Sequence, residues 1–130
     1  MEQGANLERL RMNLKQECDN LKEYFSPRII GEVNDQYVKV AKIKGQEVPW
    51  HNHEHEDELF YIVGGALLME CENRPAFTMK QGEFFVVTRG TNHRVSSTDE
   101  CQIMLIESKT NEHTGKVRAP ITKSIEEQRR

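Results

Sequence analysis

The sequence predicts an all-β domain, built as an antiparallel sandwich or barrel, that follows one amphipathic α-helix. From residue 29 to residue 107, short β-prone runs alternate with turn residues. Many short strands at nearly even spacing are typical of antiparallel sandwiches and barrels. No helical pattern of useful length interrupts these runs, which argues against a βαβ fold. A chain of 130 residues is long enough for one such domain with a real core.

Residues 1–25 carry the predicted helix. Apolar side chains recur there at spacings of three, four and seven, with a cysteine filling the gap: Leu7, Leu10, Leu14, Cys18 and Leu21. This stripe is the pattern of an amphipathic helix, with Asn6 as a candidate N-cap and the Ser26-Pro27 pair ending it. So short a helix needs a surface to cover its stripe. That surface could be its own barrel or a second copy of the chain.

The barrel itself is expected over residues 28–108. Turn residues divide this region into nine predicted strands, at Ile29–Val33, Gln36–Lys44, Val48–His53, Leu59–Val63, Ala66–Cys71, Ala76–Met79, Phe84–Val87, Arg94–Ser97 and Gln102–Glu107. A polar tail over residues 109–130 follows, which we expect to be loose in part or draped on the barrel. The predicted organisation is therefore a helix, one barrel and a tail.

Composition and charge exclude several classes of protein. Charged residues make up 30% and hydrophobic residues 36%, which is typical of globular rather than disordered chains. The net charge of −3 and the lack of Lys and Arg runs argue against nucleic acid as a partner. No stretch matches a secretory signal or a membrane span, so no membrane association and a cytoplasmic location are expected. Cys18, Cys71 and Cys101 lie far apart, which predicts buried reduced thiols.

The histidines concentrate the candidate chemistry. His51 and His53 are two residues apart on a predicted strand, so both imidazoles face one side of it. Imidazole is a ligand of many transition metals. Glu58 follows after four residues at the start of the next strand, where a carboxylate among apolar residues needs a cation or a donor. His93 begins a later strand and could close a metal site.

A competing interpretation treats residues 51–58 as a solvated loop, because this stretch is rich in acidic residues. Its flanks weaken that interpretation, since Pro49-Trp50 precedes it and an apolar strand follows it. His55 is not predicted as a ligand, and is expected to be either a surface residue or a residue that supports a ligand from behind. His113 stands apart, in the polar tail.

With these residues in place, the sequence resembles the cupin superfamily. The first cupin motif asks for Gly, five residues, His-x-His, three or four residues, Glu, six residues and Gly. The chain matches every fixed position between Gly45 and Gly65. The second motif asks for Gly, five residues, Pro-x-Gly, two residues, His, three residues and Asn. Gly82 begins its match, with Thr88 in place of the Pro and Ser97 in place of the Asn, and neither position is a metal ligand.

The resemblance implies a double-stranded β-helix, or jelly roll, with one divalent transition metal ion inside the barrel. Its ligands would be His51, His53, Glu58 and His93. The metal could be Mn, Fe, Ni, Co or Zn, because these residues serve all of them. The wider pattern from Tyr37 to Tyr61 is similar to small cupins loosely related to mannose-6-phosphate isomerase. Cupins of this kind often pair through their barrels, so a homodimer is expected.

A metal-dependent enzyme is the favoured function. Four protein ligands on a six-coordinate metal leave two positions open, which a catalytic metal needs. Such an enzyme would be a dioxygenase, isomerase or lyase that acts on a small polar molecule, such as a sugar or organic acid. Candidates to line its pocket are Phe60, Ile62, Phe84 and Val86, with plain barrel core as the alternative role for them. The alternative functions are a non-catalytic module that binds a small ligand and, as a third option, a storage or interaction barrel.

Overall fold

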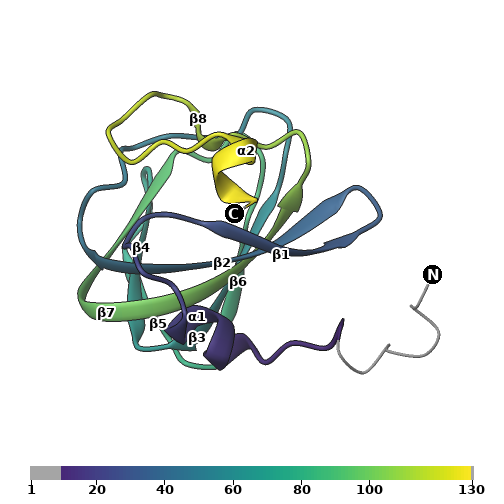
Figure 1. The fold of residues 1–130 in the computed structure, drawn as a ribbon. Coiled ribbons are helices and arrows are strands. Elements are labelled where there is room, and N and C mark those ends of the chain that lie inside the picture. The colour runs from purple at the N-terminus through teal and green to yellow at the C-terminus, as the bar shows by residue number, and fades with distance from the viewer. Residues whose placement is uncertain (1–9, 130) are drawn as a thin grey trace.

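The long strand β7 (His93–Ser108) organises the fold, because it takes part in both halves of the barrel. In the computed structural model, which describes residues 10–129, its C-terminal half pairs with β2 (Gln36–Gly45) and β3 (Glu58–Gly64). Its N-terminal end pairs with β4 (Ala66–Cys71). β7 therefore passes from one sheet into the other, and the two sheets curve around a shared interior (Figure 1).

The remaining strands extend these two sheets. β1 (Arg28–Val33) pairs with β2, and β6 (Phe84–Val87) pairs with β3, so the larger sheet has the order β1-β2-β7-β3-β6. β5 (Phe77–Lys80) pairs with β4. Every one of these pairings is antiparallel. The predicted class, an all-β antiparallel fold with a small N-terminal helix, is confirmed.

Two details of the predicted strands are corrected. The stretches 94–97 and 102–107 form one continuous strand, because the chain stays extended between them instead of turning. The stretch 48–53 is mostly loop, and only His51 pairs, in an isolated bridge with His93. Proline lacks the backbone N–H that a ladder needs, so a proline within this stretch opposes a regular strand.

Helix α1 (Leu14–Asp19) is shorter than the helix predicted over residues 1–25. It begins after Asn13, whose side chain accepts a hydrogen bond of 3.0 Å from a first-turn backbone N–H. The predicted cap Asn6 and the first stripe residue Leu7 lie outside the described residues. A local N-cap of this kind satisfies backbone donors that would otherwise lack partners, so it sets where the helix starts.

The apolar stripe of α1 packs on its own barrel. Cys18 and Leu21 are buried in a small cluster with residues of β2 and β3, and Leu14 packs partly buried against it. Leu10 does not join this cluster and is 65% exposed. Of the two surfaces considered for the stripe, the barrel covers its C-terminal part.

Strand β6 turns Phe84 and Val86 outward, whereas the sequence predicted that they line a pocket. Phe84 is 64% exposed and Val86 is 38% exposed. They lie directly opposite Tyr61 and Leu59 of β3, and residues directly opposed across antiparallel strands share a face. That face is the outer one, and Val87 is the residue of β6 that is buried in the core.

The C-terminal tail is folded onto the barrel. β8 (His113–Lys116) and α2 (Ile125–Gln128) lie across one end of the barrel, and α1 lies at the opposite end in the same view (Figure 1). Asn111, Thr114 and Gln128 are each at most 2% exposed. Of the two forms expected for this tail, the draped one is found over its described residues.

The core fills the space between the two sheets. It is built from inward side chains of the strands, among them Ala41, Ile43, Phe60, Ile62, Leu67, Met69, Met79, Val87, Val95, Cys101, Ile103 and Leu105. The three cysteines are free and buried, as predicted. Within residues 10–129, no helix has the length and apolar character that crossing a bilayer requires.

Candidate metal centre

Four polar side chains from three stretches of the chain meet inside the barrel. They are His51, His53, Glu58 and His93, and one candidate ligand atom from each lies within 4.8 Å of the others. Each of these residues is at most 5% exposed. Backbone hydrogen bonds of 3.0 and 2.8 Å join His51 and His93, which holds the histidine loop against β7. Glu58 begins β3, the neighbour of β7 in the larger sheet.

Backbone carbonyls fix the orientation of two of the imidazoles. His51 Nδ1 lies 2.9 Å from the carbonyl oxygen of Pro49, and His93 Nδ1 lies 2.9 Å from that of Thr91. A carbonyl oxygen can only accept, so each Nδ1 carries a proton and each Nε2 keeps its lone pair. Burial, followed by the neighbouring His93, lowers the pKa of His51 from 6.5 to about 4. Neutral imidazole with a free Nε2 is the form that binds a metal.

Several buried polar atoms of this cluster have no hydrogen-bond partner among the described residues. They are both ring nitrogens of His53, Nε2 of His93 and Oε1 of Glu58. Glu58 Oε1 lies 3.2 Å from His53 Nε2 and 3.6 Å from His93 Nε2, without the alignment of a hydrogen bond. Unpaired buried polar atoms are costly, and one cation between them would satisfy three at once. Three imidazoles and one carboxylate fit a divalent transition metal ion.

A second carboxyl and a lysine lie behind Glu58, and sequence reasoning missed both. Glu107 stands opposite Glu58 on β7 and shares a hydrogen bond with it. Glu107 also forms an ion pair with Lys39 Nζ and accepts a hydrogen bond of 3.1 Å from Asn111 Nδ2. Lys39 is 1% exposed and Glu107 is 2% exposed. A lysine and two carboxyls are thus sealed inside the barrel together.

The two carboxyls have opposite proton affinities. Burial raises the pKa of Glu107 well above its ordinary value, and the charge of Glu58 raises it further. Burial also acts to raise the pKa of Glu58. The hydrogen bond from Glu107 and the adjacent imidazoles outweigh it, so the pKa of Glu58 lies well below its usual range. Two carboxyls in contact cannot both ionise easily, so Glu107 keeps the shared proton while Lys39 balances the charge of Glu58.

A cavity inside the barrel is bounded on one side by this cluster. Most of its wall is apolar, with Phe25, Pro27, Ala41, Ile43, Val48, Phe60, Val95, Ile103 and Leu105. Its polar lining residues are His51, Glu58, His93, Glu107 and His113. Of the residues considered for a pocket, Phe60 lines this cavity. Ile62 is fully buried in the core and is not part of the lining, while Phe84 and Val86 lie on the outer surface.

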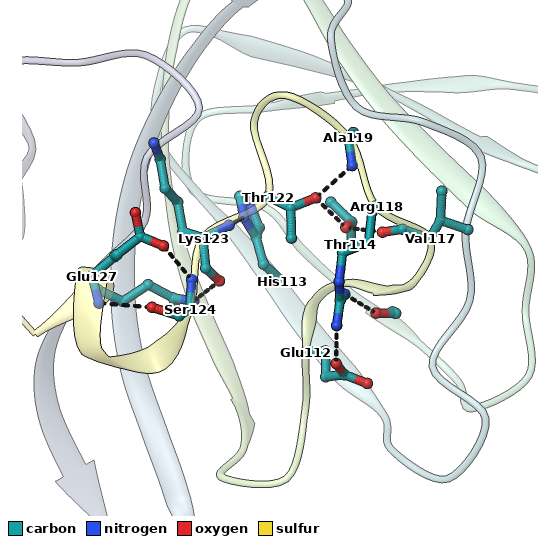
Figure 2. Close-up of polar contacts among 12 residues, drawn as sticks. Glu112, His113, Thr114, Val117, Arg118, Ala119, Thr122, Lys123, Ser124 and Glu127 are labelled. Carbon is teal, nitrogen blue, oxygen red and sulfur yellow. Dashed lines mark hydrogen bonds and ion pairs between the residues drawn. The ribbon is translucent and has the colours of Figure 1, made fainter.

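His113, which the sequence sets apart in the tail, reaches the same cavity. Its Nδ1 accepts a hydrogen bond of 2.9 Å from the backbone N–H of Lys123 (Figure 2). Burial, followed by the charge of Lys39, lowers the pKa of His113 from 6.5 to about 4. The ring is therefore neutral near pH 7. No local motif marks His113, because only the return of the tail across the barrel brings it to the cavity.

His55 is placed on the surface. Its side chain is 78% exposed, and its Nε2 lies 3.8 Å from Oε1 of the exposed Glu54. The alternation of a strand would have put His55 on the same side as His51 and His53. Because this stretch is loop, the alternation does not continue to residue 55.

Comparison with known proteins matches both the sequence and the fold. The family model described as "Cupin domain" (Cupin_2) matches residues 40–107, the stretch that contains all four residues of the cluster. "Uncharacterized protein YdbB" from Bacillus subtilis (strain 168) is 32% identical over 100 residues, which cover 77% of this chain and 88% of that protein.

Solved structures agree with this match. A cupin-2 domain containing protein from Shewanella frigidimarina NCIMB 400 is 31% identical, with a TM-score of 0.75 over 79% of this chain and 99% of the other. Hydroquinone 1,2-dioxygenase from Sphingomonas sp. TTNP3 has a TM-score of 0.66 over 78% of this chain and 75% of the other, at 11% identity. At that identity the likeness concerns the fold alone.

Proposed function

The chain belongs to the cupin family, and from this premise we propose that it is a metal-dependent enzyme whose metal is held by His51, His53, Glu58 and His93. The observation that carries the proposal is the set of converging ligand atoms, buried and left without other partners. In a structural site, the protein fills every coordination position of the metal. Four protein ligands on a six-coordinate ion instead leave two positions for a substrate. The adjoining cavity, of about 50 Å³, would receive the part of the substrate that reaches the metal.

The proposed substrate is a small organic acid with an apolar body. Sugars require hydrogen-bonding groups all round, and the cavity wall has few outside the cluster itself. An apolar wall with a polar end is typical of sites that bind a hydrocarbon part and orient one polar head. Of the sugar and the organic acid considered as substrates, the cavity lining therefore favours the organic acid.

The protein residues of the site bind the metal, orient its ligands and exclude water from it. The carbonyls of Pro49 and Thr91 hold the imidazoles of His51 and His93 in their metal-binding tautomer. Glu107 holds a proton against Glu58. When bound, the metal would supply Lewis acidity to a chelating substrate or activate water or dioxygen. Iron would favour a dioxygenase, and manganese or zinc an isomerase or lyase.

Elemental analysis of tag-free protein tests the proposal. We expect about one transition metal ion per chain in the wild type, and strong loss in His93→Ala, because that change removes a ligand but leaves the backbone bridge to His51. His55→Ala is the matched control, since His55 is a surface histidine of the same run, and it should keep the metal. A wild type that takes up no Mn, Fe, Co, Ni or Zn after reloading would contradict the proposal.

Turnover separates the enzyme from a non-catalytic module. The metal-loaded protein is incubated with a panel of organic acids, with oxygen uptake and product formation followed in parallel. Conversion by the wild type that fails in His93→Ala supports the enzyme. Saturable binding without conversion across the panel would assign the chain to the binding modules instead.

We also propose a cytoplasmic homodimer. The outer face of the edge strand β6 supports this assembly, because it exposes Phe84 and Val86 and exposed apolar groups on one face mark interaction surfaces. Size-exclusion chromatography with light scattering should give twice the chain mass, and Phe84→Ser should shift the protein toward the monomer. A wild type that is monomeric at high concentration contradicts the dimer.

A further inference from the structure

The cavity contains one polar group that the metal centre does not use. Its polar lining consists of three residues of the cluster, Glu107, which is bonded to the cluster, and His113. His113 comes from β8, so the folded tail supplies it rather than the barrel. Outside the cluster and Glu107, the lining is apolar, so His113 is a single added hydrogen-bonding group in that wall.

The tautomer of His113 is fixed by the chain itself. Nδ1 accepts a hydrogen bond from the backbone N–H of the neighbouring Lys123 (Figure 2). The ring proton of the neutral imidazole is therefore on Nε2. The same ring also lines an outer groove formed by residues 112–128. Nδ1 is engaged by Lys123, so Nε2–H is the ring donor that remains for a ligand in the cavity that His113 lines.

The segment that positions this ring is held by several contacts. Thr114 Oγ1 lies 2.8 Å from Thr122 Oγ1 and also donates to the carbonyl of Val117. The carbonyl of Lys123 accepts a hydrogen bond of 3.0 Å from the buried side chain of Gln128. Ser124 and the third residue after it form a reciprocal capping box at the start of α2. The backbone N–H that holds His113 is thus itself held in place.

We propose that His113 is a ligand-binding residue, whose Nε2–H donates a hydrogen bond to an oxygen of a small organic acid bound in the cavity. This rests on the proposed function, because the same ligand would reach the metal cluster through its other oxygens. A donor at this position selects a ligand that carries an acceptor and disfavours one that carries an ammonium group. Lys39 lies close enough to act on His113 electrostatically, and its charge keeps the imidazole in the neutral form that this tautomer requires.

Binding of 2-oxo-4-methylpentanoate to the cobalt-loaded protein tests this role. The probe has an apolar body and a head with several oxygens, and the visible spectrum of cobalt reports its arrival at the metal. His113→Asn keeps a side-chain acceptor near the Nδ1 position for Lys123 but removes the donor at Nε2. His113→Gln places an amide N–H near the Nε2 position. Cobalt content and thermal unfolding are measured for both variants beside the wild type.

We expect His113→Asn to weaken binding of the probe about ten- to a hundredfold, the range for a hydrogen bond to a charged group. His113→Gln should recover part of this loss, and both variants should keep their cobalt. Binding by His113→Asn within twofold of the wild type, equal losses in the two variants, or no binding of the probe by the cobalt-loaded wild type would each overturn the role of His113.

Failure of the wild type to take up cobalt would instead overturn the proposed function. In that case, the ring nitrogens of His113 are followed by NMR in the metal-free protein while the probe is added. A shift of the Nε2 resonance that saturates with the probe supports the donor role on its own. An unchanged resonance overturns that role as well.

Discussion

The buried ion pair between Lys39 and Glu107 makes a sharp prediction about stability. Lys39 is 1% exposed and its charge balances two carboxyls, so replacing it with methionine leaves them without a counter-charge. Removing one partner of a buried ion pair costs about 3–5 kcal/mol. For a domain of this size, that loss lowers the unfolding midpoint by about 10–20 °C. Lys39→Met should therefore be among the most destabilising substitutions in β2.

Urea unfolding of the metal-free protein measures this loss without any contribution from a bound ion. Lys44→Met is the matched control, because Lys44 is an exposed lysine on the same strand, and it should change the free energy of unfolding by less than about 0.5 kcal/mol. The double variant Lys39→Met/Glu58→Gln should recover most of the loss, because it removes both the lysine charge and the Glu58 carboxylate charge that the lysine balances.

Two results would refute this reasoning. A loss below about 1 kcal/mol in Lys39→Met would mean that the ion pair is not desolvated as its burial implies. A double variant as unstable as Lys39→Met would mean that the loss comes from the packing of the lysine stem rather than from the unbalanced charge.

Three further predictions concern acid stability, one tight turn and the tail. Burial depresses the folded-state pKa of His51 and His113 from 6.5 to about 4. The stability that each neutral ring contributes is therefore full above pH 6.5 and falls between pH 6.5 and 4 by about 3 kcal/mol for each histidine. Urea titrations across that range should show a shallower fall for His113→Asn. Gly65→Ala should destabilise more than Gly82→Ala in thermal melts, because both glycines have positive φ but a Cβ at Gly65 would lie 2.5 Å from a backbone carbonyl oxygen, and one at Gly82 meets nothing within 4 Å. Thr114→Val should lower the free energy of unfolding by about 1–3 kcal/mol, since a buried hydroxyl with two partners is lost, and an unchanged urea midpoint would show that the tail unfolds separately from the barrel.

The residues proposed as ligands could be predicted because local rules govern them. His51 and His53 are two apart, Glu58 begins the next strand, and His93 occupies the matching place in a second motif. Spacing within short segments of chain carries this information. The structure adds what spacing cannot supply, namely that His51 and His93 are joined by backbone hydrogen bonds across about forty residues.

Lys39, Glu107 and His113 escaped prediction because their roles depend on contacts across the fold. A signal for Lys39 did exist, since it shares the inward alternation of β2 with Ala41 and Ile43 and so occupies a core position with a charge. Such a residue needs a buried partner, but the sequence does not say which carboxylate supplies it. His113 has no comparable signal, because its segment has neither a clear helical nor a clear strand period.

The predictions for the inward face of β6 and for the length of α1 were wrong for different reasons. Phe84 belongs to a run of four apolar residues, in which alternation cannot tell inside from outside, and a shift of one residue exchanges the faces. Pairing with β3 decides the matter. The helical stripe over residues 1–25 shows which side chains could share a face, but the cap at Asn13 decides where the observed helix begins.

The position of β7 after the strands that it pairs with has a consequence for synthesis on the ribosome. β2, β3 and β4 all need β7 to complete their sheets, and β7 ends at Ser108. Until that strand has left the exit tunnel, the nascent chain can form local hairpins but exposes unpaired strand edges and apolar side chains of its future core. Premature termination before β7 should therefore yield aggregating fragments rather than a smaller working barrel. The order of elements thus makes the nascent chain dependent on chaperones until β7 has emerged.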